Sequence, residues 1–422
     1  MNRTLRTVAF LCLLAALTVL AYGPVFGQPL IEDDYPNIAQ AQLYGPVAGW
    51  PAMMHDPVFR VRATTWLLMY GIHCVFGMWA PAYYAALVAL QILNTWLVFA
   101  LGSWRDIGYR TAAWAAAFFA VYEGHQEAVM WLSGSTEPLM LFFGLLSLLF
   151  WIQVIQNAGA MRIAFYVASL ACFSLALLSK ESAVIWAALL LLPIVFDRPS
   201  WRQAFLLVPY AVLSAVVALS ILESRSQSFR FQDGSFSMSA PFWLTWPHNM
   251  LRLFWPWGLA ALIAIFLWRP AAYRKLLTLG LCWAGLGLIP YSFLTYSRYI
   301  PSRQLHLASV GLALVAGYAF MELFHRYWQR RRAIVVAVCG LLLIHNVGYL
   351  WVKKRSQFLA RAAPTEALIA FARTHPGLIY VQCFPRQQII AESAIQLTTT
   401  SRVVWAPTEG AHTFCYPAES HR

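Results

Sequence analysis

The stretch TVAFLCLLAALTVLAYGPVFGQPLIEDDYPNIAQ, residues 7–40, joins a long apolar run to a cluster of acids. The run from Val8 to Phe26 suits a membrane span, since a spanning helix needs about 20 apolar residues. Because Arg3 and Arg6 precede it, a signal peptide is the alternative. The run is longer than the roughly 7–15 apolar residues of a signal peptide, and no small-residue cleavage site closes it. We therefore predict a retained anchor whose N-terminus is cytosolic.

The composition of the whole chain is that of a membrane protein. Of its 422 residues, 60% are hydrophobic and only 11% are charged, with a mean hydropathy of +0.59. Soluble domains carry roughly 25% charged residues. The net charge of +13 does not indicate nucleic-acid binding, because the basic residues lie in short loops between apolar runs. We predict an all-α polytopic membrane protein without a nucleic-acid partner.

Apolar runs recur along the chain and predict about eleven transmembrane helices. One further segment, RATTWLLMYGIHCVFGMW at residues 62–79, is either a twelfth span or an interfacial helix. Charge favours the interfacial helix, because a twelfth span would move the basic loop HRYWQRRR at residues 325–332 outside. The predicted spans lie near residues 8–27, 82–102, 111–123, 137–155, 163–178, 183–196, 203–222, 247–268, 276–294, 304–323 and 333–352.

Most acidic residues then fall on the non-cytosolic face, which also carries the C-terminal tail. We predict a transmembrane domain over residues 1–352, with its first external loop at 28–81, and a small soluble domain over residues 353–422. The tail has a helical pattern at 361–373, followed by a strand-like GLIYVQCF, a helical RQQIIAESAIQL and a strand-like SRVVWAP. These patterns predict an α/β appendage.

The tail also holds the two cysteines beyond the last predicted span, Cys383 and Cys415. The non-cytosolic compartment permits disulfides. A disulfide requires the two Cα atoms to lie within about 7 Å, which sequence alone leaves open. The chain has no C-x-x-C motif and no Cys/His cluster, so we predict neither a zinc site nor a redox site.

Two adjacent acids follow the first predicted span. Asp33 and Asp34 precede a polar segment that suits a helix, so they could cap its N-terminus. The alternative is catalytic: one carboxylate takes a proton from a hydroxyl while its neighbour aids the electrostatics or binds a metal. We predict Asp33 as the general base, with Asp34 as the second candidate.

Further ionisable groups lie in the other predicted external loops. EGHQEAVMWLSGSTEP holds His125 and Glu127, for which the alternative is an interfacial loop anchored by Trp131. LLSKESAV places Lys180 and Glu181 between two spans, where a local ion pair between them is the alternative.

A third loop supplies paired arginines. SRYIPSRQ holds Arg298 and Arg303, and guanidinium groups suit phosphate oxygens. Anchoring to lipid headgroups is the alternative. Together, carboxylates, a histidine, a lysine and arginines on one face form the set needed to join a hydroxyl nucleophile to a phosphate-bearing lipid donor.

These motifs resemble those of the GT-C glycosyltransferases that use polyprenyl-phosphate sugars, particularly the O-mannosyltransferase-like branch. The acidic pair of that branch resembles EDDYPNI, and its H-x-x-H-x-E-x-V-x-W-x-x-G-R pattern resembles YEGHQEAVMWLSGST. Its R-Y-x-x-x-P loop resembles SRYIPSR, and the likeness runs in order from about residue 25 to 312. The branch also has an arginine-led interfacial segment that ends in glycine, a second span with tyrosines at its start and a late asparagine, and a lysine–glutamate loop. These features resemble Arg62, Gly77, Tyr83, Tyr84, Asn94, Lys180 and Glu181.

The sequence departs from the branch at three positions. Gln91 stands where the branch usually has histidine, and Ser135 replaces the arginine after the glycine. Glu123 stands near the first histidine–proline pair. The donor sugar and the acceptor are therefore left open.

The resemblance implies a GT-C-like fold and sugar transfer with inversion, on the non-cytosolic face, to a hydroxyl of a protein, lipid or glycan. It implies a polyprenyl-phosphate-linked sugar as donor. The implied substrate-binding residues are Arg62, His125, Glu127, Lys180, Glu181, Arg298 and Arg303. A divalent cation is left open; Asp34 and Glu127 would be its ligands. The expected location is a bacterial inner membrane, with the site facing the periplasm.

Two other functions use similar lipids. A transporter or flippase of lipid-linked sugars would place its site near the bilayer midplane within internal repeats. The two halves of this sequence show no such repeat, and its ionisable residues cluster at one surface. An O-antigen ligase or polymerase would not need the early acidic pair.

Overall fold

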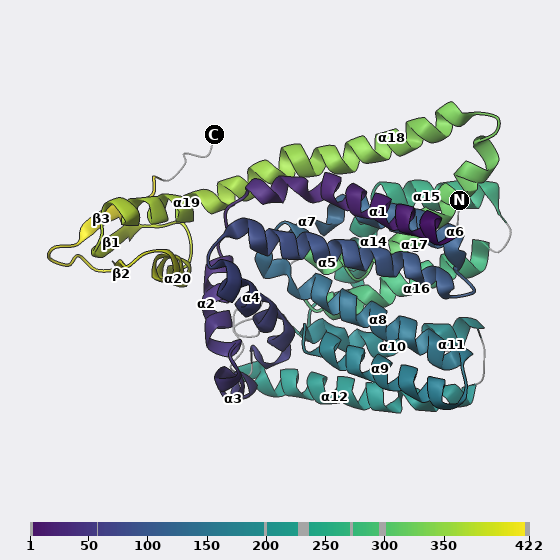
Figure 1. The fold of residues 1–422 in the computed structure, drawn as a ribbon, viewed down its shortest axis with the longest axis horizontal. Helices are drawn as coiled ribbons and strands as arrows, with labels where there is room; N and C mark the ends of the chain where they lie inside the picture. Colours follow the sequence, from purple (N-terminus) through teal and green to yellow (C-terminus); the bar gives the residue numbers. More distant parts are fainter. Residues whose placement is uncertain are drawn as a thin grey trace.

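The computed structural model describes residues 3–56, 58–197, 201–226, 236–270, 273–294 and 301–417. Figure 1 shows long helices running side by side, short helices across one end, and a small appendage beyond that end. The long helices are α1 (Arg3–Tyr22), α5 (Ala80–Ala100), α6 (Gly108–Val121), α8 (Thr136–Gln156), α9 (Gly159–Leu177), α12 (Val208–Glu223), α14 (Phe242–Phe254), α15 (Trp257–Trp268), α16 (Tyr273–Leu288), α17 (Ser309–Tyr327) and α18 (Arg332–Gly348).

The core of the bundle lies where α17 packs between α6 and α16. Small residues allow this close approach, as is common between membrane helices. A Cβ atom on Gly311 of α17 would lie 2.3 Å from the carbonyl oxygen of Gly280 on α16. Any larger side chain at Gly311 would therefore push these two helices apart.

The outer helices expose large apolar side chains, as a membrane protein does toward lipid. Leu219 on α12 is 65% exposed and Ile344 on α18 is 74% exposed. Within the described ranges, six helices are long and apolar enough to cross a membrane, or seven if the pair α14–α15 is one bent span. The chain is an integral membrane protein. Helical segments lie at every predicted span, but the count of about eleven stays a prediction.

Two of the predicted spans are broken helices. The run at 183–196 divides into a 3₁₀ turn (Glu181–Ile185), α10 (Trp186–Leu189) and α11 (Leu192–Asp197). The run at 247–268 is the pair α14–α15, bent by 80°. Pro256 lies at this break, where its missing N–H prevents a continuous helix.

Short helices cover one end of the bundle, where the first external loop was predicted. They are α2 (Asp34–Tyr44), α3 (Trp50–His55) and α4 (Ala63–Phe76), and Figure 1 shows α2 and α4 lying across the ends of the long helices. With 14 residues, α4 is shorter than the roughly 20 that a span requires. It occupies the segment predicted to be interfacial.

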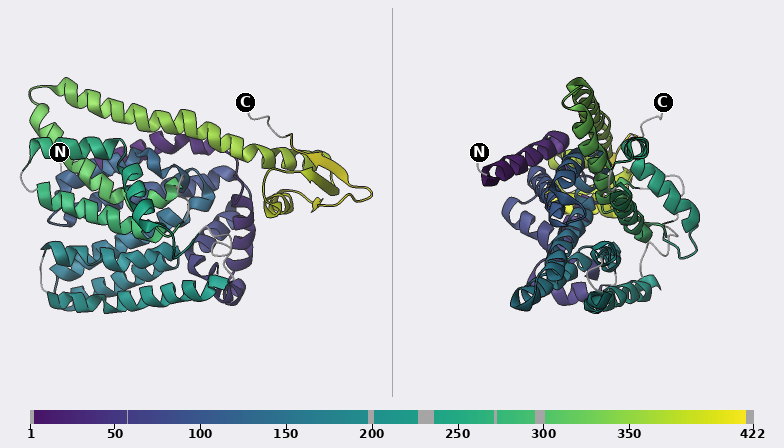
Figure 2. Two further views of the ribbon diagram at one scale, coloured as in Figure 1. Left: turned by 180° about the vertical axis from the view of Figure 1, so that it is seen from behind. Right: turned by 90° about the vertical axis from the view of Figure 1, so that its right-hand side faces the viewer.

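The appendage follows α18 without a break in the helix. A π-helical turn (Tyr349–Lys354) joins α18 to α19 (Arg355–Thr374), so the predicted domain boundary at 352 falls inside one long helix. Then come β1 (Leu378–Cys383), α20 (Gln388–Thr398), β2 (Arg402–Val404) and β3 (His412–Cys415). The three strands form a parallel sheet in the order β2-β1-β3, of which only β3 lacked a prediction. Figure 2 shows this unit projecting beyond the bundle.

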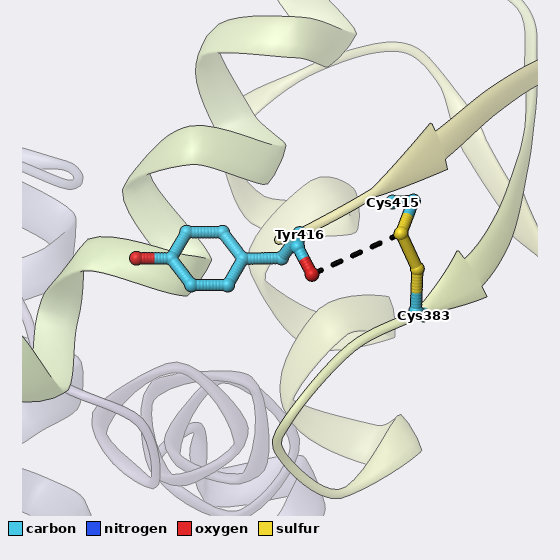
Figure 3. Close-up of a disulfide and its surroundings, with 3 residues drawn as sticks. All are labelled: Cys383, Cys415 and Tyr416. Atoms are coloured by element: carbon cyan, nitrogen blue, oxygen red, sulfur yellow. Dashed lines mark hydrogen bonds between the residues drawn. A yellow bond between two sulfur atoms is a disulfide. The ribbon is translucent and has the colours of Figure 1, made fainter. Parts of the chain in front are cut away.

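A disulfide joins the ends of two neighbouring strands of the appendage. Cys383 of β1 and Cys415 of β3 are bonded, with their Cα atoms 4.6 Å apart (Figure 3). The pairing that the sequence left open is therefore formed. It ties the short edge strand β3 to β1, and the Phe414 ring of β3 also packs on Phe371 of α19.

The topology predicts which loops face the cytosol. An alkaline phosphatase fused after Ser356, at the same end as α2, should be active because this enzyme folds only outside the cytosol. A fusion within residues 326–332, at the other end of α18, should be inactive. Phosphatase activity of the two fusions in whole cells measures this. The reverse pattern would contradict the predicted orientation.

Candidate active site

The acidic loop between α1 and α2 is held to the bundle by Asp34. Its Oδ1 accepts hydrogen bonds from the backbone N–H and the hydroxyl of Ser133, at 2.8 and 2.7 Å. Its Oδ2 accepts one from the backbone N–H of Ile31, at 2.8 Å. Complete burial raises the pKa of Asp34 to about 7, although the hydrogen bonds from Ser133 and Ile31 act in the opposite direction. Asp34 is a buried anchor of this loop.

Asp33 differs from its neighbour in being only partly buried. It occupies the N-cap position of α2, but its side chain does not cap that helix. The carboxylate of Asp34 likewise bonds backward to Ile31 instead of to the first turn. Neither side chain of this pair therefore caps α2, which was the first interpretation of the two acids.

Glu32, the third acid of the cluster, reaches the C-terminal appendage. Its Oε2 lies 2.5 Å from Nη2 of Arg361 on α19, and its Oε1 lies 2.9 Å from Nε of Arg386. A second contact lies beside it, where the Tyr35 hydroxyl donates to Glu366 at 2.9 Å. The appendage is thus docked on the acidic loop.

Trp131 connects the C-terminal appendage to the 3₁₀ turn Ser302–Leu305 that precedes α17. The guanidinium of Arg361 lies 4.3 Å from the centre of its ring, and that of Arg303 lies 4.7 Å away. Such contacts stabilise a cation over an aromatic face. The chain turns sharply just after Trp131, where a Cβ atom on Gly134 would lie 2.0 Å from the carbonyl oxygen of Glu127.

A largely apolar cavity of about 360 Å³ adjoins Arg303. Its walls include Ile221 and Leu222 of α12 and Phe293 of the loop after α16. Among the residues that the structure describes, three cationic side chains line it: Arg62, Lys180 and Arg303. An apolar chamber with a few cations suits an amphiphile that has an anionic head.

Two of these cations are paired across the fold. Lys180 forms a buried ion pair with Glu137, which also accepts from the Tyr291 hydroxyl at 2.8 and 3.0 Å. Arg62 pairs with Glu181 at 2.8 Å. The local Lys180–Glu181 pair considered from the sequence is therefore replaced by two pairs between distant segments. The reason is that Glu181 begins a 3₁₀ turn, while Lys180 before it is extended.

His125 lies in the core of the bundle and does not line this cavity. Its Nδ1 accepts from the Gln91 amide at 2.9 Å, and its Nε2 lies 2.7 Å from the Ser309 hydroxyl. Gln91 also accepts from Nε2 of His306 at 3.1 Å, and Ser309 donates to the His306 carbonyl at 2.6 Å. These four residues close a ring of hydrogen bonds. Gln91 thus links two histidines within the fold.

Glu127 contacts the backbone beside Arg303, where its Oε2 accepts a hydrogen bond from the backbone N–H of Arg303 at 3.4 Å. Arg298 lies outside the described residues. Among the residues that the structure does describe, no group of three or more His, Cys, Asp or Glu side chains is placed to hold a metal ion. Both oxygens of Asp34 accept hydrogen bonds from donors, so it does not suit a metal ligand as placed.

Solved structures with this arrangement of helices include an archaeal oligosaccharyltransferase and ArnT. The archaeal oligosaccharyltransferase AglB from Archaeoglobus fulgidus, solved with an inhibitory peptide and a dolichol-phosphate, aligns with 94% of this chain at a TM-score of 0.58 and 11% identity. ArnT from Cupriavidus metallidurans aligns with 94% of the chain at a TM-score of 0.55 and 14% identity in its apo state. The structure of ArnT bound to undecaprenyl phosphate also aligns with 94% of the chain, at a TM-score of 0.53 and 16% identity. This chain has the GT-C fold.

The extent of these matches differs between the two proteins. The GT-C chain described here covers 64% of AglB, less than two thirds of its length, and 86% and 75% of the two ArnT structures. No protein-family model matches the sequence, and no curated protein is similar to it. The GT-C fold agrees with the family resemblance inferred from the motifs.

Several residues of the site had no predicted role. Arg361 appeared only as the start of a helical pattern, and Glu32 only as a member of the acidic cluster. Ser133 and Tyr291 carried no signal at all, because a hydroxyl that bonds a carboxylate from a distant segment follows no local pattern. Their partners are 99 and 154 residues away in the chain.

Replacing Asp34 by asparagine should destabilise the protein more than it changes the chemistry. An asparagine offers one acceptor oxygen, so either Ile31 or Ser133 would lose its buried acceptor. An unsatisfied buried donor costs about 1–3 kcal/mol. Thermal unfolding of the purified protein in detergent measures the loss. An unchanged unfolding temperature would show that Asp34 does not anchor the loop.

Proposed function

We propose that this protein is a membrane glycosyltransferase that moves a sugar from a polyprenyl-phosphate donor to an acceptor hydroxyl. The observation that carries the proposal is the cavity of about 360 Å³, apolar over most of its wall and lined by Arg62, Lys180 and Arg303. A polyprenyl chain needs an apolar surface, and its phosphate needs cations. The GT-C fold supports this, since ArnT of this fold was solved with undecaprenyl phosphate and AglB with a dolichol-phosphate.

The reaction would be a single displacement on the non-cytosolic face. The acceptor oxygen forms a bond to the anomeric carbon while the bond from that carbon to the phosphate oxygen breaks. The electron pair of the broken bond leaves with the polyprenyl phosphate, and the hydroxyl proton passes to a carboxylate. Attack opposite the leaving group inverts the anomeric configuration.

The two members of the acidic pair take different roles in this scheme. Asp34 is enclosed by its three hydrogen bonds, so its proposed role is to hold the loop. Asp33 is partly exposed beside it and is the proposed general base. A positioned base contributes roughly 10²–10⁴-fold to such a transfer.

Arg303 is the proposed contact of the donor phosphate. Its stacking on Trp131 holds the guanidinium beside the cavity. Lys180 adds positive charge there, although it is shared with Glu137. Cations stabilise a phosphate leaving group as negative charge develops on it. The acceptor, the sugar and the bacterial inner membrane as location remain expectations from the family resemblance.

Arg303→Ala should weaken binding of undecaprenyl phosphate, because a hydrogen bond to a charged group contributes about 1.5–3 kcal/mol. That corresponds to roughly a 10- to 100-fold higher Kd. Native mass spectrometry of the purified protein with undecaprenyl phosphate measures this Kd, with Arg303→Lys as the charge-conserving control.

In a deletion strain, mass spectrometry should show lipid-linked sugar accumulating and one glycan lost. Unchanged glycans with lipid-linked sugar on the wrong side of the membrane would instead indicate a flippase.

A further inference from the structure

Glu32 has a backbone conformation that few residues other than glycine adopt. Its φ is +44°, in the left-handed region, where a side chain crowds its own backbone. Such conformations persist when surrounding contacts impose them, and they cluster at functional sites. Here the surrounding contacts are the ion pairs of Glu32 with Arg361 and Arg386.

Both arginines belong to the C-terminal appendage, although Glu32 belongs to the first external loop. Arg361 lies on α19 and Arg386 lies between β1 and α20. Helix α20 also packs against α2, the helix that begins directly after Asp33. The loop conformation therefore depends on a domain that is more than 300 residues away in the chain.

Asp33 lies between two residues that are each fixed by a different part of the protein. Glu32, before it, is held by the appendage. Asp34, after it, is held by Ser133 of the transmembrane domain. With both neighbours fixed, the backbone of Asp33 has little freedom, while its own side chain stays partly exposed.

We infer that Arg361 and Arg386 are positioning residues of the active site: by clamping Glu32, the docked appendage fixes the placement of Asp33. This inference rests on the proposed role of Asp33 in the transfer reaction. It assigns a catalytic purpose to the C-terminal appendage without requiring that domain to contact donor or acceptor. Misplacement of a reacting group by about 1 Å can cost about 100-fold in rate.

The variants that test the clamp are Glu32→Gln and Arg386→Ala in the full-length protein. Arg386 is the sharper choice, because Arg361 also stacks on Trp131 beside the cavity. Arg402→Ala, an exposed arginine on β2 of the same appendage, is the matched control. Arg386→Lys keeps the positive charge and should retain part of the transfer activity that Arg386→Ala loses.

Three measurements separate positioning from folding and donor binding. Hydrogen exchange of residues 29–36 in nanodiscs should speed up in Glu32→Gln and Arg386→Ala. Conversion of endogenous lipid-linked sugar in a complemented deletion strain, followed by mass spectrometry, should slow by about 10- to 100-fold. Binding of undecaprenyl phosphate by native mass spectrometry should stay within twofold of the wild type. The double variant should lose no more than Glu32→Gln alone, because the contact that Arg386→Ala removes is one of the two that Glu32→Gln already removes.

Three results would overturn the inference in distinguishable ways. If Asp33→Asn is inactive while both clamp variants transfer sugar at the wild-type rate, the clamp does not position Asp33 and the proposed function stands. If Asp33→Asn is fully active, the proposed base is wrong and the inference fails with it. A loss of transfer in Arg402→Ala equal to that in Arg386→Ala would show a general effect of the appendage and would also overturn the inference.

Discussion

Asp33→Asn is expected to abolish sugar transfer while the protein still folds and binds the donor lipid. A hydroxyl is a poor nucleophile until a base removes its proton in the transition state, and losing that base costs roughly 10²–10⁴-fold. Asparagine keeps the size of the side chain and removes only its charge. Since Asp33 does not cap α2, the helix loses no capping bond. The measurement is conversion of lipid-linked sugar in a complemented deletion strain, followed by mass spectrometry.

The matched control for this variant is its neighbour, Asp34→Asn. Both changes replace a carboxyl group of the same loop by an amide of similar size, but only Asp34 is fully buried and bonded to Ser133. We therefore expect Asp34→Asn to lower the unfolding temperature and Asp33→Asn to leave it unchanged. Undecaprenyl phosphate should bind to both purified variants. Full transfer activity in Asp33→Asn would disprove its role as the base.

The overall architecture could be predicted from the sequence because it follows from local patterns. Apolar runs located the long helices, and the charge of residues 325–332 favoured an interfacial segment where α4 now lies. The strand-like run GLIYVQCF located β1. The breaks in the runs at 183–196 and 247–268 were missed, since their average hydropathy resembles that of continuous spans.

The sequence proposed ionisable residues for the candidate site but did not predict how they pair. Lys180 and Glu181 are neighbours in the chain, and their proximity favoured a local pair. The actual partners, Glu137 and Arg62, are 43 and 119 residues away. Charge pairing across that separation is decided by how the helices pack, which sequence periodicity does not encode. The same holds for Glu32 and the arginines of the appendage.

His125 illustrates a different limit. Its position in a motif that resembles a family pattern suggested contact with a substrate, yet its ring nitrogens bond Gln91 and Ser309 inside the bundle. A histidine without charge partners is accommodated in a core when both nitrogens have hydrogen-bond partners. Its burial could not be inferred from the sequence, because the charged and polar residues around it predict an exposed loop, whereas residues 122–137 are all buried or partly buried.

The second large effect is expected at the buried pair of Lys180 and Glu137. Lys180→Met should destabilise the protein by about 3–5 kcal/mol, the usual cost of removing one partner from a buried ion pair. Methionine fills a volume similar to that of lysine, so the loss of stability comes from the carboxylate of Glu137, which is left without its cation. Glu137 is completely buried, and without Lys180 its oxygens keep only the Tyr291 hydroxyl among the described hydrogen bonds. Thermal or chemical unfolding in detergent measures this loss.

The double variant Lys180→Met/Glu137→Gln separates the role of Lys180 in stability from its role in binding the donor in the cavity. Glutamine removes the buried negative charge and still accepts from Tyr291, so stability should return close to the wild-type value, as replacing both partners of a buried pair often does. Binding of undecaprenyl phosphate should stay weak, because the cavity still lacks the lysine that lines it. If the double variant regains both stability and donor binding, Lys180 acts only through Glu137. The donor phosphate would then depend on Arg303 and Arg62 among the cations described along this cavity.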